Sequence, residues 1–346
     1  MLDERKLRVL YAIIDSYVSS AEPIGSRTIS KYYDLGVSPA TIRNEMSDLE
    51  DLGFLNKTHS SSGRVPSDKA YRLYVDKMIN MEQKVDKRRK QEIKSILEKE
   101  HRELDQLVQN SAKLLSQITS YTALALSPQI KETKIKHIQL VPIEKSQILL
   151  IIVNETGLVK NTVLKLEKPI PEDQLLALTN MLNIKLKNKA ISEIEKGALS
   201  EVFTEFYQYK YEIEKILPVI NKSVESIESV DLYADGITKL LSFPEYKDID
   251  KVRTIISFIE DKNELIQLMV DDTLAQDISI KIGNENYYAP IKDCSIITAT
   301  YKLDGETIGK IGILGPTRMD YISLAKTLKI FSENISEIIN NYNVTK

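Results

Sequence analysis

The sequence predicts a multidomain protein of the α+β class. The first 80 residues contain short helices separated by tight turns and followed by a β-hairpin signal. Strand-like segments then occur in two blocks, over residues 135–166 and 278–314, and a charged helical block over residues 191–268 lies between them. At roughly 150 residues per domain, a chain of 346 residues is long enough for two or three domains with cores of their own.

The N-terminal region is predicted to contain three helices and a two-stranded wing. After a first amphipathic helix over residues 2–19, a short helix over residues 26–33 is opened by an N-cap serine. The next helix has Ser38 at its N-cap and Pro39 at its first position, and Gly53 ends it. Strands over residues 54–58 and 64–65 enclose a polar loop, and a further helix begins at Ser67. Together these elements form a winged helix-turn-helix, whose second helix normally enters the major groove of DNA.

The start of this second helix carries the residue types that contact bases. Arginine hydrogen-bonds guanine, asparagine hydrogen-bonds adenine, and alanine or the threonine methyl group contacts thymine. The start of the preceding helix suits a phosphate, and basic side chains occur on the wing. The predicted DNA contacts are Ser38, Ala40, Thr41, Arg43 and Asn44 on the recognition helix, Ser26, Arg27 and Thr28 on the preceding helix, and Lys57, His59 and Arg64 on the wing.

A protein-interaction module is the alternative interpretation of the winged helix. The first 80 residues have about as many acidic as basic side chains, so they create no strong basic field. Glu45 is the acidic residue closest to the expected contact turn. The basic cluster of Lys57, Arg64, Lys69 and Arg72 around the wing favours DNA binding. With a net charge of −3 for the whole chain, that binding is expected to be local.

The rest of the chain mixes helices and strands. A long polar helix is predicted over residues 84–117, and strands over 135–142, 147–153 and 158–166 precede a helix over 172–187. After the helical block, two strands flank an Asp304-Gly305 turn, which is a strong hairpin signal, and a last helix covers residues 321–340. The pattern predicts either one α+β domain interrupted by an insert or two separate domains in tandem.

Several long motifs resemble one protein family along essentially the whole chain. They are Ser-Pro-Ala-Thr-Ile-Arg-Asn-Glu-Met (38–46), Ser-Ser-Gly-Arg-Val-Pro-Ser-Asp-Lys-Ala-Tyr-Arg-Leu-Tyr-Val-Asp (61–76), Tyr-Ala-Asp-Gly (233–236), Leu-Leu-Ser-Phe-Pro-Glu-Tyr (240–246) and Ile-Leu-Gly-Pro-Thr-Arg-Met-Asp-Tyr (313–321). In this order they are similar to the HrcA family of bacterial heat-inducible transcription repressors. The resemblance implies a cytoplasmic, nucleoid-associated homodimer that binds an inverted-repeat operator of chaperone operons as double-stranded DNA and is tuned by the GroEL chaperonin.

The resemblance also implies a domain arrangement. Residues 1–82 would be the DNA-binding domain, residues 83–190 and 270–346 two parts of one GAF-like domain, and residues 191–269 a mainly helical inserted dimerisation domain. The dimer contact is predicted at apolar and aromatic residues of the insert, namely Phe203, Phe206, Tyr207, Ile213 and Ile216. Packing of these residues on the main domain, with a dimer through the helix over residues 84–117, is the alternative.

The sequence contains no recognisable catalytic, metal or cofactor constellation. The three histidines lie far apart, and the lone Cys294 has no suitably placed partner and fits a reducing cytosol. Gly309–Gly315 lacks the ending of a phosphate-binding loop and has the apolar pattern of a buried strand. Neither a signal peptide nor a run of membrane-spanning length is predicted. The remaining alternative is a regulator that senses a small molecule, which a pocket lined by Tyr287, Tyr288 and Arg318 would favour.

Overall fold

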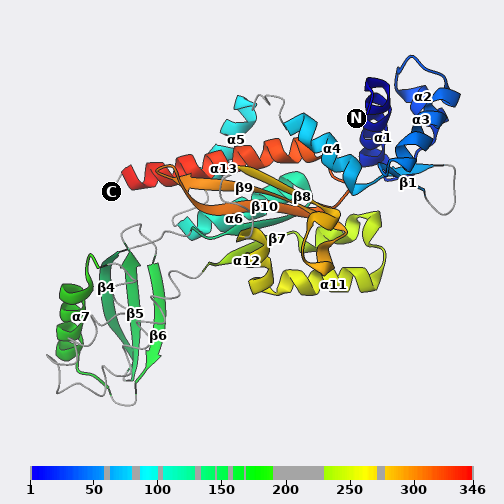
Figure 1. Ribbon diagram of the computed structural model, residues 1–346. Coiled ribbons are helices and arrows are strands. Elements are labelled where there is room, and N and C mark those ends of the chain that lie inside the picture. The colour runs from blue at the N-terminus through cyan, green and yellow to red at the C-terminus, as the bar shows by residue number, and fades with distance from the viewer. Residues whose placement is uncertain are drawn as a thin grey trace. The chain divides into compact units, whose positions relative to one another are not determined.

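The computed structural model describes residues 2–57, 63–79, 86–99, 104–128, 134–144, 146–154, 159–166, 169–189, 230–270 and 277–344 (Figure 1). The chain divides into two compact units. The first unit comprises residues 1–99, 109–126 and 232–337, and the second comprises residues 100–108, 127–231 and 338–346.

The first unit begins with the predicted winged helix-turn-helix. Its elements are α1 (Glu4–Ser20), α2 (Ser26–Tyr32), α3 (Pro39–Asp51), β1 (Leu55–Lys57), β2 (Arg64–Pro66) and α4 (Asp68–Ile79). Ile13, Ile29, Ile42 and Leu49 are fully buried between the first three helices. The wing strands pair antiparallel, as the pattern of short strands around a polar loop predicted.

One helix start differs from the prediction. Gly25, and not Ser26, is the N-cap of α2, and no side chain caps this helix. The reason is that Ile24 forms a β-bridge with Arg64, which keeps the chain extended up to Gly25. The helix can therefore begin only at Ser26, and glycine is an accepted N-cap residue.

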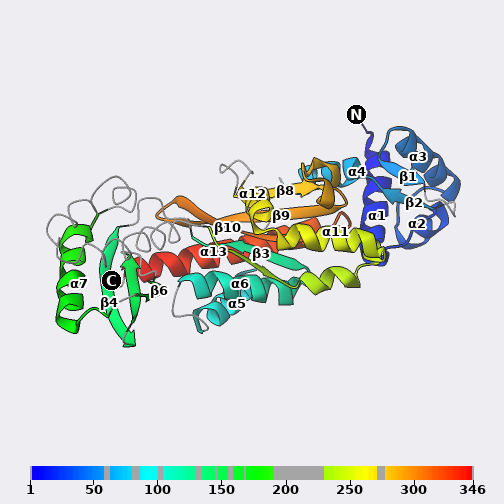
Figure 2. The same cartoon turned by 90° about the horizontal axis from the view of Figure 1, so that it is seen from below.

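The rest of the first unit is built on a five-stranded antiparallel sheet with the order β7-β3-β10-β9-β8. The strands are β3 (Thr122–Leu126), β7 (Leu232–Asp235), β8 (Ile278–Ile282), β9 (Cys294–Leu303) and β10 (Glu306–Pro316). Helix α13 (Tyr321–Val344) lies along one face, and α11 (Ile249–Glu260) and α12 (Lys262–Val270) lie on the other (Figures 1 and 2). Short 3-10 turns, including η3 (Ile237–Ser242), η4 (Pro244–Tyr246), η5 (Gly283–Glu285) and η6 (Ala289–Ile291), connect the elements. This sheet and its helices form the GAF-like region.

The predicted β9–β10 hairpin is present. Asp304 and Gly305 have positive φ values of 50° and 87°, the left-handed conformation that a tight hairpin turn of this kind requires. Gly309–Gly315 lies inside β10, where nearly every residue is buried, as its apolar pattern predicted. The prediction of a buried strand rather than a phosphate-binding loop is therefore confirmed.

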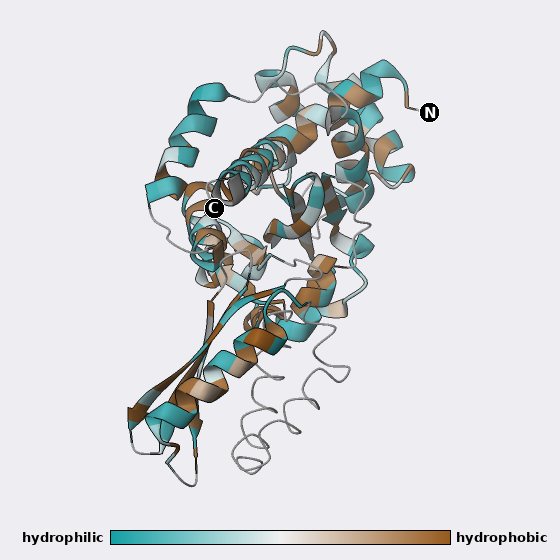
Figure 3. Cartoon of the chain, turned by 90° about the vertical axis from the view of Figure 1, so that its left-hand side faces the viewer, coloured by the Kyte–Doolittle hydropathy of each residue, from teal (hydrophilic) through white to brown (hydrophobic). Residues whose placement is uncertain are grey.

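The two predicted strand blocks do not form one sheet. Strands β4 (Ile135–Glu144), β5 (Gln147–Asn154) and β6 (Val159–Lys165) make a separate three-stranded sheet in the second unit. These strands contain many apolar residues (Figure 3). Helix α7 (Glu172–Leu186) packs on β4, and its Asn183 accepts a hydrogen bond from Ile138 N and donates one to Ile138 O.

The insert consequently has other limits than those predicted. The insert begins after residue 126 and ends near residue 231, whereas it was expected to cover residues 191–269. Strand β3, which the sequence analysis missed, pairs with β10 and β7. The main sheet therefore contains no strand from residues 135–166. Helical residues 237–270 likewise belong to the main sheet's unit.

The polar segment after the winged helix forms two described helices, where one helix over residues 84–117 was predicted. They are α5 (Lys87–Lys99) and α6 (Leu104–Thr119).

Candidate nucleic-acid interface

The start of α3 is built as the sequence predicts. Ser38 Oγ accepts a hydrogen bond from Thr41 N at 3.2 Å and lies 3.0 Å from Thr41 Oγ1, while Pro39 occupies the first helical position. This cap satisfies one of the free N–H groups at the helix start and fixes where the first turn begins. The recognition helix therefore starts at its predicted position, with Ser38 as N-cap and Pro39 as the first helical residue.

The predicted base-reading residues come together on the first turns of α3. Ser38, Ala40, Arg43 and Asn44 are exposed, and Thr41 is half-buried. Among the described residues, the side chains of Arg43 and Asn44 take part in no hydrogen bond or ion pair. Both side chains are free to meet a ligand.

The acidic residue nearest to this surface is turned inward. Glu45 is 4% exposed and forms ion pairs with Arg5 at 2.6 Å and Lys6 at 3.0 Å, both from α1. Lys6 also pairs with Asp48 at 3.1 Å, and these two carboxylates raise the pKa of Lys6. Because α1 neutralises them, these acidic groups oppose the approach of a phosphate less than the sequence suggested.

Helix α2 places its three predicted phosphate contacts in one turn. Ser26 is half-buried, and Arg27 and Thr28 are exposed. The start of α3 over residues 38–44, here called the recognition turn, and the first turn of α2 both display hydrogen-bonding or cationic side chains. Contacts to phosphates and bases require such side chains.

The wing residues differ in their availability. Arg64 has only 16% of its side chain exposed and donates to Glu50 Oε2 at 2.6 Å, so it ties the wing to the end of α3. Lys57 pairs with the same Glu50 at 3.0 Å but has 67% of its side chain exposed. The two cations, Lys57 first, lower the pKa of Glu50. His59 lies outside the described residues.

The predicted basic cluster around the wing does not form as one surface. Lys69 lies over the Phe54 ring at 4.5 Å and donates to Leu52 O. Arg72 pairs with Glu285 of the GAF-like region, so its expected place beside the wing is wrong. Helix α4 turns its residues at positions 68 and 72 toward η5, which the sequence spacing alone did not show.

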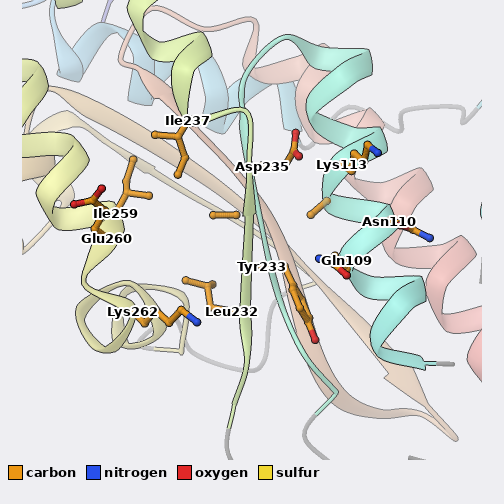
Figure 4. Close-up of a pocket in the computed structure, with 12 residues that line it drawn as sticks. Gln109, Asn110, Lys113, Leu232, Tyr233, Asp235, Ile237, Ile259, Glu260 and Lys262 are labelled. Atoms are coloured by element: carbon orange, nitrogen blue, oxygen red, sulfur yellow. The ribbon is translucent and has the colours of Figure 1, made fainter.

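The GAF-like region contains a pocket of about 620 Å³ beside the edge strand β7 (Figure 4). Helix α6 contributes amide and cationic groups, and the elements opposite contribute both apolar and charged side chains. Its lining comprises Gln109, Asn110, Ala112, Lys113, Leu232, Tyr233, Ala234, Asp235, Ile237, Ile259, Glu260 and Lys262. Tyr287, Tyr288 and Arg318, which would have favoured a small-molecule sensor, are not among them: Tyr287 is 87% exposed and Arg318 is paired with Glu245.

The remaining chemically notable groups serve packing. Cys294 is buried beside the Tyr246 hydroxyl at 3.2 Å, and burial raises the pKa of its thiol to about 11.

Within the described ranges, no group of three histidine, cysteine or acidic side chains could hold a metal ion. A search of the same residues finds no helix with the length and apolar character needed to span a membrane.

The predicted dimerisation residues, Phe203, Phe206, Tyr207, Ile213 and Ile216, lie outside the described residues.

Comparison with known proteins gives a consistent result. Residues 105–324 match the family model described as the HrcA protein C terminal domain. The chain is 43% identical over 339 residues to the heat-inducible transcription repressor HrcA of Alkaliphilus metalliredigens, and these residues make up 98% of each chain. It is 42% identical to the HrcA of Clostridium tetani over 99% of this chain and 97% of that one. A crystal structure of a hypothetical protein shares the fold, with a TM-score of 0.69 and 20% identity over 99% of this chain and all of that one.

Proposed function

Because this chain belongs to the HrcA family of heat-inducible transcription repressors, we propose that it represses chaperone operons by binding an inverted-repeat operator as a homodimer. One observation is the main support for placing the DNA contact at the start of α3. The start of α3 presents Arg43 and Asn44 exposed and without partners among the described residues, while α1 neutralises Glu45 behind them. A cationic and amide surface at the start of a recognition helix is what base readout requires.

We propose a division of labour among the contact residues. Arg43 and Asn44 read base edges, Ala40 and Thr41 contact thymine methyl groups, and Ser38 caps the helix that presents them. The first turn of α2, with Ser26, Arg27 and Thr28, holds a phosphate. On the wing, Lys57 contacts phosphate because most of its side chain is exposed, and Arg64 acts through Glu50 by holding the wing against α3.

The homodimer is proposed because one winged helix covers only one half-site of an inverted repeat. The proposed contact remains the insert, at Phe203, Phe206, Tyr207, Ile213 and Ile216. Charges at Phe206 and Ile216 should give a monomer by sedimentation.

GroEL is the proposed regulator. The proposed location is the cytoplasm, where the repressor lies at the nucleoid when it is bound to its operator. A heat-inducible repressor has to lose activity on warming, and the single cysteine cannot form an internal thiol switch. A chaperonin that restores the active fold would link repression to the amount of unfolded protein in the cell.

The proposal is tested by mobility shift and footprinting of the purified protein on the promoters of its own chaperone operons, with and without GroEL. Arg43→Ala should cost roughly 1–3 kcal/mol of operator binding and relax specificity at one position per half-site. Lys57→Ala should weaken binding to all sequences alike and reduce the salt slope by about one. Arg253→Ala, which removes an exposed cation of α11 far along the chain, is the control. Unchanged affinity and salt slope in both test variants would show that the winged helix does not read this DNA.

A further inference from the structure

Two motifs outside the winged helix meet each other, and one of them contacts the last turn of α1. Arg318, from the segment after β10, donates to Glu245 of η4 at 2.5 Å and to Val18 O in the last turn of α1 at 2.8 Å. A cation at this end of α1 also interacts favourably with the helix dipole. Arg318 of the motif at residues 313–321 thus contacts the winged helix, and Glu245 of the motif at residues 240–246 holds Arg318 by an ion pair.

A second polar contact joins α4 to the turn after β8. Arg72 forms a two-pronged ion pair with Glu285, with Nε–Oε1 at 2.7 Å, and also donates to Ile280 O at 2.6 Å. Asp68, at the start of α4, accepts from Asn284 N at 3.0 Å and from Asn284 Nδ2 at 2.9 Å. Two-pronged arginine pairs are geometrically specific, so this contact defines an orientation as well as an attraction.

Packing between these two contacts closes the interface. Tyr71 of α4 and Tyr321 of α13 are 2% and 1% exposed, and their ring centroids are 5.7 Å apart. Gly283 has a φ of 52°, and a Cβ atom there would lie 2.2 Å from the Asp68 carboxylate. The close approach of α4 therefore requires glycine at this position.

The recognition turn takes no part in this interface. The contacts come from α1 and α4, whereas Arg43 and Asn44 of α3 remain exposed. We propose that Asp68, Arg72, Asn284, Glu285, Arg318 and Glu245, here termed the interdomain dock, hold the winged helix at one angle on the GAF-like region. The dock thereby determines which half-site spacing the dimer accepts, and its members are positioning residues for operator recognition. This inference rests on the proposed function.

The physical basis is the geometry of dimeric DNA recognition. Two recognition helices on a rigid dimer fit half-sites at one separation and one rotation about the duplex. If each winged helix swings freely, the second half-site is still reached, but the gain from bivalent binding is smaller and less dependent on spacing. A rigid dock therefore increases both affinity for the correct spacing and rejection of the others.

The test uses two variants that break the dock by different means. Arg72→Gln removes the ion pair, and Gly283→Ala places a methyl group against Asp68. Each has a matched control. Arg88→Gln breaks an exposed ion pair with Glu92 on α5, and Gly305→Ala introduces the same left-handed strain at a hairpin tip with nothing within 4 Å.

Binding is measured on duplexes with the natural spacer, with spacers changed by one to four base pairs, and with a single half-site. We expect both dock variants to lose about tenfold in affinity for the natural spacer and to show a flatter dependence on spacing, with single half-site binding unchanged. The controls should match the parent protein. Dock variants that keep the parent's spacing preference would overturn the inference, whereas a parent that binds no duplex would overturn the proposed function instead.

A measurement without DNA separates the two outcomes further. Spin labels at Lys31→Cys on α2 and Lys329→Cys on α13, diluted with unlabelled protein, report the distance between the winged helix and the GAF-like region. Both positions are exposed, and the native Cys294 is buried. The distribution should be narrow in the parent and broad in Arg72→Gln and Gly283→Ala. A broad distribution in the parent, or no broadening in the variants, contradicts a rigid dock.

Discussion

Two serines in similar sequence positions have different structural roles. Ser38 accepts a hydrogen bond from Thr41 N and caps α3, whereas Ser26 is the first residue of α2 and its cap position belongs to Gly25. Side-chain chemistry alone did not separate them. What separates them is the bridge between Ile24 and Arg64, which decides how far the extended chain reaches.

This difference gives a prediction at the residue scale. Ser38→Ala should lower the local free energy of unfolding of α3 by about 1 kcal/mol, since the Thr41 N–H loses its acceptor. Ser26→Ala should change that of α2 by less than about 0.5 kcal/mol, because no cap is lost. Hydrogen exchange of the backbone amides resolves the two helices separately. Equal losses at the two sites would contradict this assignment of the caps.

At the scale of elements, α5 is held to α13 by charge. Lys90 pairs with Glu333 and Glu337, each at 2.7 Å, and Lys94 pairs with Glu337 at 2.7 Å. Asn334 Nδ2 donates to Lys90 O at 3.0 Å. Hydrogen bonds from Lys90 first and Lys94 second lower the pKa of Glu337 below its ordinary value of 4.5.

The sign of the resulting pH dependence follows from that direction. A carboxyl group whose pKa is lower in the folded state stabilises the fold fully above its unfolded pKa, and this stabilisation is lost as the pH falls through the folded value. We predict that α5 loses protection below about pH 4, in hydrogen exchange corrected for the intrinsic rate at each pH. Glu337→Gln should weaken α5 already at neutral pH and reduce this acid step. Glu92→Gln, in an exposed pair on the same helix, is the control and should leave the step in place.

At the scale of the whole molecule, the family function requires that repression be lost on warming. The proposed mechanism is marginal stability, in which a few kcal/mol separate the active dimer from an inactive form. Operator binding by the purified protein should then fall over a modest temperature rise and return in part when GroEL and ATP are added. GroEL without ATP is the control. Binding retained well above the growth temperature, with no effect of the chaperonin, would contradict the mechanism.

Much of the winged helix could be predicted from the sequence, and its charge pairing could not. The N-cap at Ser38, the end of α3 at Gly53 and the wing strands were all visible in short stretches of chain. The directions of Glu45, Arg64 and Arg72 were not, because each is set by a partner at least 14 positions away in the sequence. Charge counts along the chain therefore described a basic cluster that the fold separates.

The sequence by itself determined the elements whose signals are local, such as the recognition helix and the turn at Asp304-Gly305, because caps and tight turns depend on a few neighbouring residues. Only the tertiary structure decided which strands share a sheet. Strand β3 pairs with β10 nearly 190 residues later, whereas β4, β5 and β6 pair with one another in a separate sheet. Alternating apolar residues predict that a strand exists, but its partner is chosen by packing between distant segments, which no local pattern records.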